Sequence, residues 1–113
     1  MKELSKEERI KKEIRRIKKF YAELPKNKQE IVIPLIENAA FMRVTLEDLQ
    51  KVINENGAVE EYKNGKDQWG TKISSEAQAY NSIIKNYEKI NSRLSDMLPD
   101  VQEKSKLDEL MKL

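Results

Sequence analysis

The 113-residue sequence contains no cysteine and no histidine, and it has only three glycines and three prolines. Without cysteine, a disulfide or a thiolate metal site is excluded. Without histidine, the usual general base and the commonest zinc ligand are missing, as are ordinary nucleophile–base pairs. The glycines, at positions 57, 65 and 70, match no phosphate-binding loop. These absences predict a protein that is not an enzyme and has no cofactor and no bound metal.

Long hydrophobic runs are missing as well. The longest apolar-dominated run, Ile31 to Ile36, is far shorter than the roughly 20 residues that cross a bilayer. The start has no apolar segment followed by a small-residue cleavage site, so no secretory signal is predicted. We therefore expect a cytoplasmic protein with no membrane partner.

Charge is abundant but unevenly distributed. Hydrophobic residues make up 38% of the chain and charged residues 37%, so a monomer can bury only a modest core. This balance favours an extended helical shape, or self-association that completes the core between subunits. The net charge is +2, yet residues 1–28 carry eleven Lys/Arg against five Glu, whereas residues 29–62 carry two against seven Asp/Glu.

A basic helix is predicted within residues 1–26. Ser5 and Glu8 form a capping box at its start, and Pro25 ends it by pushing Leu24 out of the helical region. Its apolar residues recur at steps of three and four, which places them on one stripe. They are Ile10, Ile14, Ile17, Tyr21 and Leu24.

Residues 27–99 are predicted to form an antiparallel helical hairpin, with helices at about 27–56 and 75–98. Pro34 indicates either a kink or a short turn before the main helix. The capping box of the second helix is assigned to Ser75 and Gln78. Both helices carry heptad-like seams typical of coiled coils, and the remainder of their apolar surface favours a homo-oligomer. The seam residues are Leu35, Ala39, Met42, Leu46, Leu49 and Ile53 in the first helix and Tyr80, Ile83, Tyr87, Ile90 and Leu94 in the second.

The connection, residues 57–74, breaks the helical periodicity. Asn64-Gly65 is a turn signal, and the flanking residues are compatible with a short β-ribbon or an ordered loop. A ribbon would pair Val59, Glu61 and Lys63 with Asp67, Trp69 and Thr71. For Trp69 and Tyr62 we expect a lid folded over the end of the hairpin rather than stacking on bases. Glu60, Glu61 and Asp67 are expected to be solvated rather than to bind a cation.

The fold class predicted is thus all-α: a helical hairpin with an additional N-terminal basic helix. For residues 100–113 we expect either a weak amphipathic helix or a tail that becomes ordered on docking.

The basic face of the first helix is the main functional signal. Clustered Lys/Arg on one helical face is typical of phosphate-backbone binding. The alternatives are pairing with the acidic second helix and, ranked last because interfacial Trp is absent, a membrane surface. We expect DNA contact from seven residues, Arg9, Lys11, Lys12, Arg15, Arg16, Lys18 and Lys19.

The stretch from Glu37 to Pro99 resembles the terminase small subunits of phages and prophages of Gram-positive bacteria. The features that carry the resemblance are AAFM at 39–42, EYKNGKDQWGTK at 61–72 and YNSIIKNY at 80–87. The resemblance covers somewhat more than half of the chain.

The resemblance implies a DNA-recognition subunit of a packaging motor in the host bacterial cell. Such proteins form rings through a central helical hairpin, bind the packaging-initiation region of phage double-stranded DNA and regulate a separate terminase large subunit that carries ATPase and nuclease. Many of them have an N-terminal helix-turn-helix domain, whereas here a single basic helix precedes the hairpin. DNA contact by residues 9–19 is therefore a charge argument.

Overall fold

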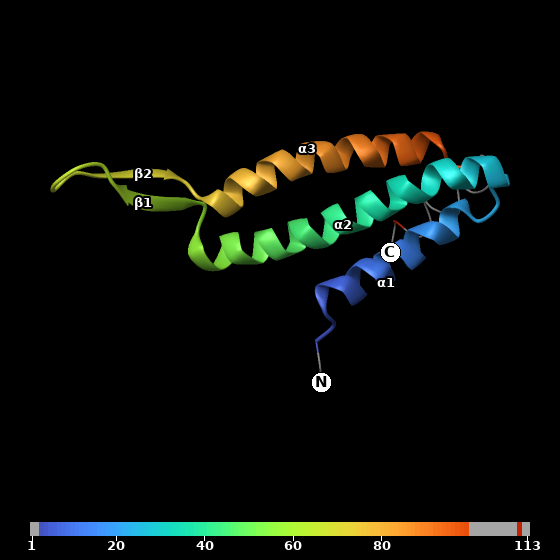
Figure 1. Ribbon diagram of the computed structural model, residues 1–113, viewed down its shortest axis with the longest axis horizontal. Coiled ribbons are helices and arrows are strands. Elements are labelled where there is room, and N and C mark those ends of the chain that lie inside the picture. The colour runs from blue at the N-terminus through green and yellow to red at the C-terminus, as the bar shows by residue number, and fades with distance from the viewer. Residues whose placement is uncertain (1–2, 100–110, 112–113) are drawn as a thin grey trace.

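The computed structural model describes residues 3–99 and Met111, and shows an elongated, mostly helical protein about 64 Å long. Two long helices, α2 and α3, run antiparallel, and α1 lies along the first half of α2 (Figure 1). A two-stranded ribbon projects from the opposite end. In chain order the elements are α1 (Lys6–Lys18), the 3-10 turn η1 (Lys19–Tyr21), α2 (Lys26–Asn56), β1 (Val59–Lys63), β2 (Trp69–Ile73) and α3 (Ser75–Asp96).

The helical content of the predicted fold is confirmed, but the class is not strictly all-α because the connection forms an antiparallel sheet. Of the two alternatives predicted for residues 57–74, a β-ribbon or an ordered loop, the structure shows the ribbon. The C-terminal segment from Asp100, for which a weak helix or a tail was expected, lies outside the described residues apart from Met111.

Helix α1 starts where the capping box predicts. The Ser5 hydroxyl oxygen accepts a hydrogen bond from the Glu8 backbone N–H at 3.1 Å. The α-helix ends at Lys18, earlier than Leu24, because the chain tightens into η1 before it turns at Pro25. In this turn the Gln29 side-chain amide donates to the backbone carbonyl oxygen of Tyr21.

Helix α2 is continuous through Pro34, so of the two predicted alternatives the short turn before the main helix does not occur. Proline removes one backbone N–H and leaves the carbonyl of Glu30 without its helical partner. Pro34 and Glu30 are both exposed, so water can hydrogen-bond to that carbonyl oxygen. The helix begins at Lys26, one residue before the predicted start.

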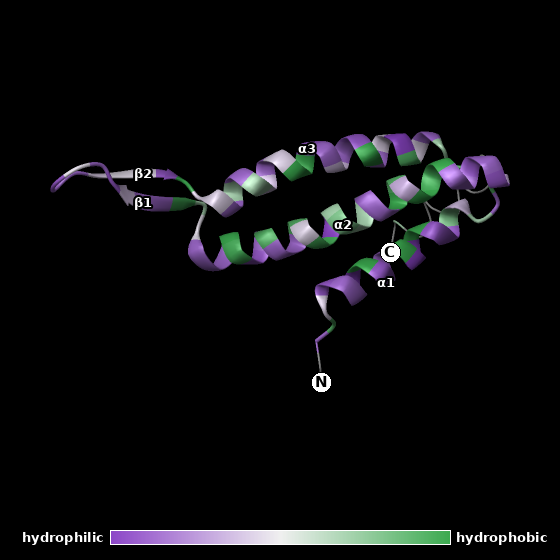
Figure 2. Cartoon of the chain, in the orientation of Figure 1, coloured by the Kyte–Doolittle hydropathy of each residue, from purple (hydrophilic) through white to green (hydrophobic). Residues whose placement is uncertain are grey.

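The core lies between α2 and both other helices. Of the predicted seam, Ala39, Leu46 and Leu94 are buried, and the remaining positions are half-buried. Four further buried positions of α2 lie beside this seam, at steps of four, and the heptad pattern did not predict them. They are Val32, Ile36, Ala40 and Val44. Helix α2 therefore has two packed faces, and the apolar stripe of α1 packs on one of them within the same chain. Figure 2 shows the hydrophobic residues concentrated along these facing sides.

Tyr21 connects the α1–α2 turn to the end of α3. Its buried hydroxyl donates a hydrogen bond to the backbone carbonyl oxygen of Leu94 at 2.5 Å. Burial raises the pKa of the Tyr21 phenol to about 12, because the ionised form would lose its hydration.

The ribbon pairs Val59 with Ile73 and Lys63 with Trp69. Asp67 is not part of a strand, contrary to the predicted pairing, because the chain reverses through residues 65–67 with Asp67 at a φ of 67°. The predicted lid is also wrong: the ribbon points away from the helices, and Trp69 is 67% exposed (Figure 1).

Ser74 joins the ribbon to α3. Its N–H donates to the Ala58 carbonyl at 2.9 Å, and its buried hydroxyl accepts from the Ala77 N–H at 3.1 Å. Ser74 is therefore the N-cap of α3, and the predicted capping box at Ser75 is wrong by one residue. The cap lies at Ser74 because this residue still has the extended backbone of the strand end.

Candidate nucleic-acid interface

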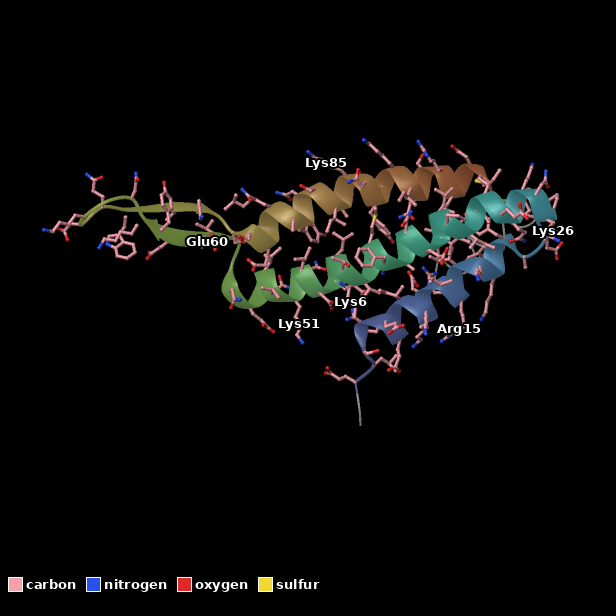
Figure 3. The ribbon with its side chains drawn as sticks, in the orientation of Figure 1. Lys6, Arg15, Lys26, Lys51, Glu60 and Lys85 are labelled. Carbon is pink, nitrogen blue, oxygen red and sulfur yellow. The ribbon has the colours of Figure 1, made fainter. Side chains whose placement is uncertain are left out.

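The seven basic residues predicted to contact DNA lie on α1 and on the first residue of η1, Lys19. Six are exposed and Arg9 is half-exposed. Figure 3 shows Arg15 on the outer side of α1, away from α2. These residues do not form one uniform surface, because some pair with carboxylates of residues 3–99 and others do not.

Three of the seven form ion pairs. Arg9 contacts Asp48 of α2 at 2.6 Å, and Arg16 contacts Glu13 through two hydrogen bonds of 2.6 and 3.0 Å. The third, Lys11, lies 3.6 Å from Glu7. The hydrogen bonds to these carboxylates raise the pKa of both arginines. Only Arg9 reaches the acidic second helix, so within residues 3–99 the alternative of pairing with α2 applies to one residue of the seven.

Lys12, Arg15 and Lys19 form a second group, which we call the basic stripe. Their spacing of three and four residues places them on one side of α1. No carboxylate of the described residues lies within ion-pair distance of these three. The stripe therefore presents three positive charges to solvent. Lys18 is also exposed, but it lies on the other flank of the helix.

The basic stripe borders a groove of about 1090 Å³ between α1, α2 and α3. The opposite wall includes Arg43 of α2 and Tyr87 and Asn91 of α3. Arg43 donates a long hydrogen bond of 3.4 Å to the Tyr87 hydroxyl, and this contact raises the pKa of the guanidinium. Among the described residues, six Lys/Arg and two Glu line the groove, so this part of its lining carries a formal charge of +4. The charged lining residues are Arg9, Lys12, Arg15, Arg16, Lys19, Arg43, Glu13 and Glu47.

Arg43 and Asn91 were not found by sequence reasoning. Arg43 belongs to a helix that is acidic overall, and no periodic signal separates it from the neighbouring seam. Met111 also lines the groove. The stripe and Arg43 thus both contribute to the lining of this groove, although Arg15 projects from the outer side of α1.

Acidic residues do not gather into a metal site in the part of the chain that the structure describes. In the ribbon, Glu60 and Glu61 alternate between faces, and Glu60 lies 3.5 Å from Lys72. Over the same residues, no helix combines the length and the apolar character that a bilayer crossing demands.

Comparison with protein-family models, curated proteins and solved structures gives no match to this chain.

Proposed function

We propose that the protein is the DNA-binding, oligomeric regulatory subunit of a phage DNA-packaging terminase. It would bind double-stranded DNA of the packaging region in the cytoplasm of the host bacterial cell and act on a terminase large subunit, without catalysis of its own. The resemblance of residues 37–99 to terminase small subunits supports the class. The helical hairpin and the cationic surface of α1 are compatible with it.

The basic stripe is the observation that carries the DNA-binding part of the proposal. Lys12 and Lys19 are seven residues apart, which corresponds to about 10 Å along a helix. Duplex DNA carries about six phosphate charges over that length of its axis. Because no described carboxylate neutralises the stripe, its contact with phosphates would release counterions rather than break ion pairs.

The test is fluorescence anisotropy of labelled duplex DNA between about 50 and 200 mM salt, with variants of matched charge. The stripe variant carries Lys12→Glu, Arg15→Glu and Lys19→Glu. The control variant reverses three exposed lysines of α2 and α3, Lys51, Lys85 and Lys89. Both variants change the net charge by the same amount, so a difference between them reports the position of the charges and not their sum.

We expect the affinity of the wild-type protein to fall with salt, the stripe variant to lose binding and the control variant to keep most of it. Replacement of the three stripe residues by glutamine should lower the slope of log K against log salt by about three. Absence of binding at low salt, or an affinity that does not depend on salt, would contradict the proposal. Equal losses in the two charge-reversed variants would contradict the assignment to the stripe.

A second candidate function is a protein-interaction or scaffold module that binds no nucleic acid. The exposed apolar side chains of the ribbon, Val59, Tyr62, Trp69 and Ile73, favour it. Reversal of Arg15, Arg16 and Lys19 to Glu discriminates the two functions. Loss of assembly in light scattering, with no DNA binding by the wild type, supports the module; intact oligomers that no longer retain DNA support the terminase subunit.

A further inference from the structure

The ribbon is the part of the protein with the least support from the rest of the chain. It consists of two strands, both outer edges are uncovered by the described residues, and its large apolar side chains are exposed (Figure 1). Isolated two-stranded ribbons are marginally stable in water, and three or more strands are usually needed. Exposed edges also attract other strands, which is why proteins cover or close them.

The hydrogen-bond pattern shows which backbone groups remain available. The Ser74 N–H donates to the Ala58 carbonyl, and the Asn64 N–H donates to the Gln68 carbonyl. In an antiparallel ladder, hydrogen-bonded pairs alternate with non-bonded pairs. The residues bonded within the ribbon are thus the even-numbered ones. The N–H and C=O groups of the odd-numbered residues point outward, from Val59, Glu61 and Lys63 on β1 and from Trp69, Thr71 and Ile73 on β2.

Two copies placed side by side in the same orientation bring β2 of one copy next to β1 of the other, and these strands are antiparallel. Copies related by rotation about an axis along the ribbon lie at the same height. The register between neighbouring copies is then the same as the register within one ribbon. Thr71 of one copy therefore lies opposite Glu61 of the next copy. Both residues present outward N–H and C=O groups, and an antiparallel bonded pair needs that arrangement.

The side chains are complementary in the same register. Lys72 would lie opposite Glu60 of the next copy, in a non-bonded pair where side chains approach closely. Trp69 would lie opposite Lys63, and Ile73 opposite Val59. Within one copy, Lys72 and Glu60 form an ion pair at 3.5 Å. The Lys63 ammonium lies 5.9 Å from the centroid of the Trp69 ring. Each favourable contact of the ribbon is therefore repeated between copies.

We propose that the ribbon is a self-association element, in which the β2 edge of one copy pairs in antiparallel fashion with the β1 edge of a second copy. This contact is heterologous, because the two partners use different edges, and repetition builds a ring when the rotation closes. The resulting sheet curves until no edge remains, and the face with Val59, Trp69 and Ile73 is covered. The inference rests on the oligomeric part of the proposed function and is independent of DNA binding.

Proline substitutions at outward-facing positions test the proposal. Thr71→Pro removes an outward N–H from β2, and Glu61→Pro removes one from β1, while the ladder inside the ribbon keeps its bonds. The matched controls, Thr71→Ala and Glu61→Ala, change the same side chains and keep the N–H groups. Circular dichroism establishes that the helices of all four variants are intact, since the ribbon lies outside the helical core.

Light scattering behind a sizing column is the measurement. We expect the wild-type protein and both alanine controls to show the same mass, a multiple of 13.3 kDa, and each proline variant alone to run as a 13.3 kDa monomer. Each proline variant retains the edge that the other has lost. An equimolar mixture should therefore form a dimer of twice 13.3 kDa, or 26.6 kDa.

Three outcomes would overturn the inference. The first is a wild-type protein that stays monomeric at a concentration of 100 μM, which would assign the free edges to a different partner. The second is the wild-type mass in both proline variants, since assembly would then use other surfaces. The third is a dimer formed by one proline variant alone. Such a dimer would mean that two copies of the same edge pair with each other, rather than β2 with β1. None of these masses depends on DNA, so failure of the terminase proposal in the anisotropy experiment is a separate result.

Discussion

Replacement of Ile36 by alanine should destabilise the protein severely, whereas the same replacement at Ile31 should have almost no effect. Both residues lie on α2, but Ile36 is 1% exposed in the core between the three helices and Ile31 is 60% exposed. Loss of three buried carbon atoms at Ile36 costs about 2.4 kcal/mol of transfer free energy at about 0.8 kcal/mol per carbon. The cavity left behind brings the expected cost to about 3.5 kcal/mol.

At Ile31 the lost burial is small, and alanine is the better helix former, so the change should be within about 0.5 kcal/mol. The assay is urea denaturation followed by circular dichroism, with the slope of the transition as a check that the unfolded state is unchanged. A cost below about 1 kcal/mol at Ile36 would show that the core tolerates the missing side chain, against the burial described above. A cost above about 2 kcal/mol at Ile31 would show that this face of α2 is covered, by another copy or by another part of the chain.

Three further predictions follow from buried polar groups. The raised pKa of Tyr21, about 12 against 10.0 for a free phenol, keeps its proton in the folded state while the unfolded state loses it. The free energy of unfolding should therefore fall as the pH rises from about 10 to about 12, and Tyr21→Phe should abolish this part of the pH dependence in urea denaturation. Ser74→Ala should lower the free energy of unfolding by about 1 kcal/mol through loss of the N-cap of α3, whereas Ser75→Ala should leave the melting temperature nearly unchanged. The opposite result would show that Ser75 is the cap. Thr45→Val should raise the free energy of unfolding by about 1 kcal/mol, because the buried Thr45 hydroxyl has no hydrogen-bond partner among the described residues; a destabilised variant would reveal a partner.

The helical pattern of the sequence predicts most of the hairpin, because steps of three and four residues are a local property of each helix. The heptad pattern identifies a single seam in each helix of the hairpin. In α2 that seam was assigned to the contact with α3. Val32 and Ile36 lie beside this seam, in one cluster with Leu94 of α3 and the apolar residues of α1. Their burial therefore depends also on the return of α1 along α2, which no local pattern encodes. The two adjacent serines before α3 show the same limit. Both are good N-cap residues, and the end of β2 decides between them.

For the candidate interface, the sequence predicts the sign and the approximate location of the charge. It does not predict which charges remain unpaired, because Arg9 is paired with Asp48, a residue 39 positions away. The basic stripe is recognised only once the ion pairs are known. Arg43 could not be assigned to the groove for a similar reason: its position next to α1 results from the packing of α1 on α2.

The shallow packing of α1 has an energetic consequence. All residues of α1 are described, and none of them is buried; the helix is attached through half-buried side chains such as Ile14 and Ile17 and through the contact of Arg9 with Asp48. Local opening of such an element requires much less free energy than global unfolding, and its amides exchange with solvent hydrogen first. The buried Tyr21, directly after α1, anchors the end of the helix through its hydrogen bond to the Leu94 carbonyl oxygen. Opening of α1 would also uncover Val32 and Ile36 of α2, so the placement of its positive charges is tied to the core that these residues form.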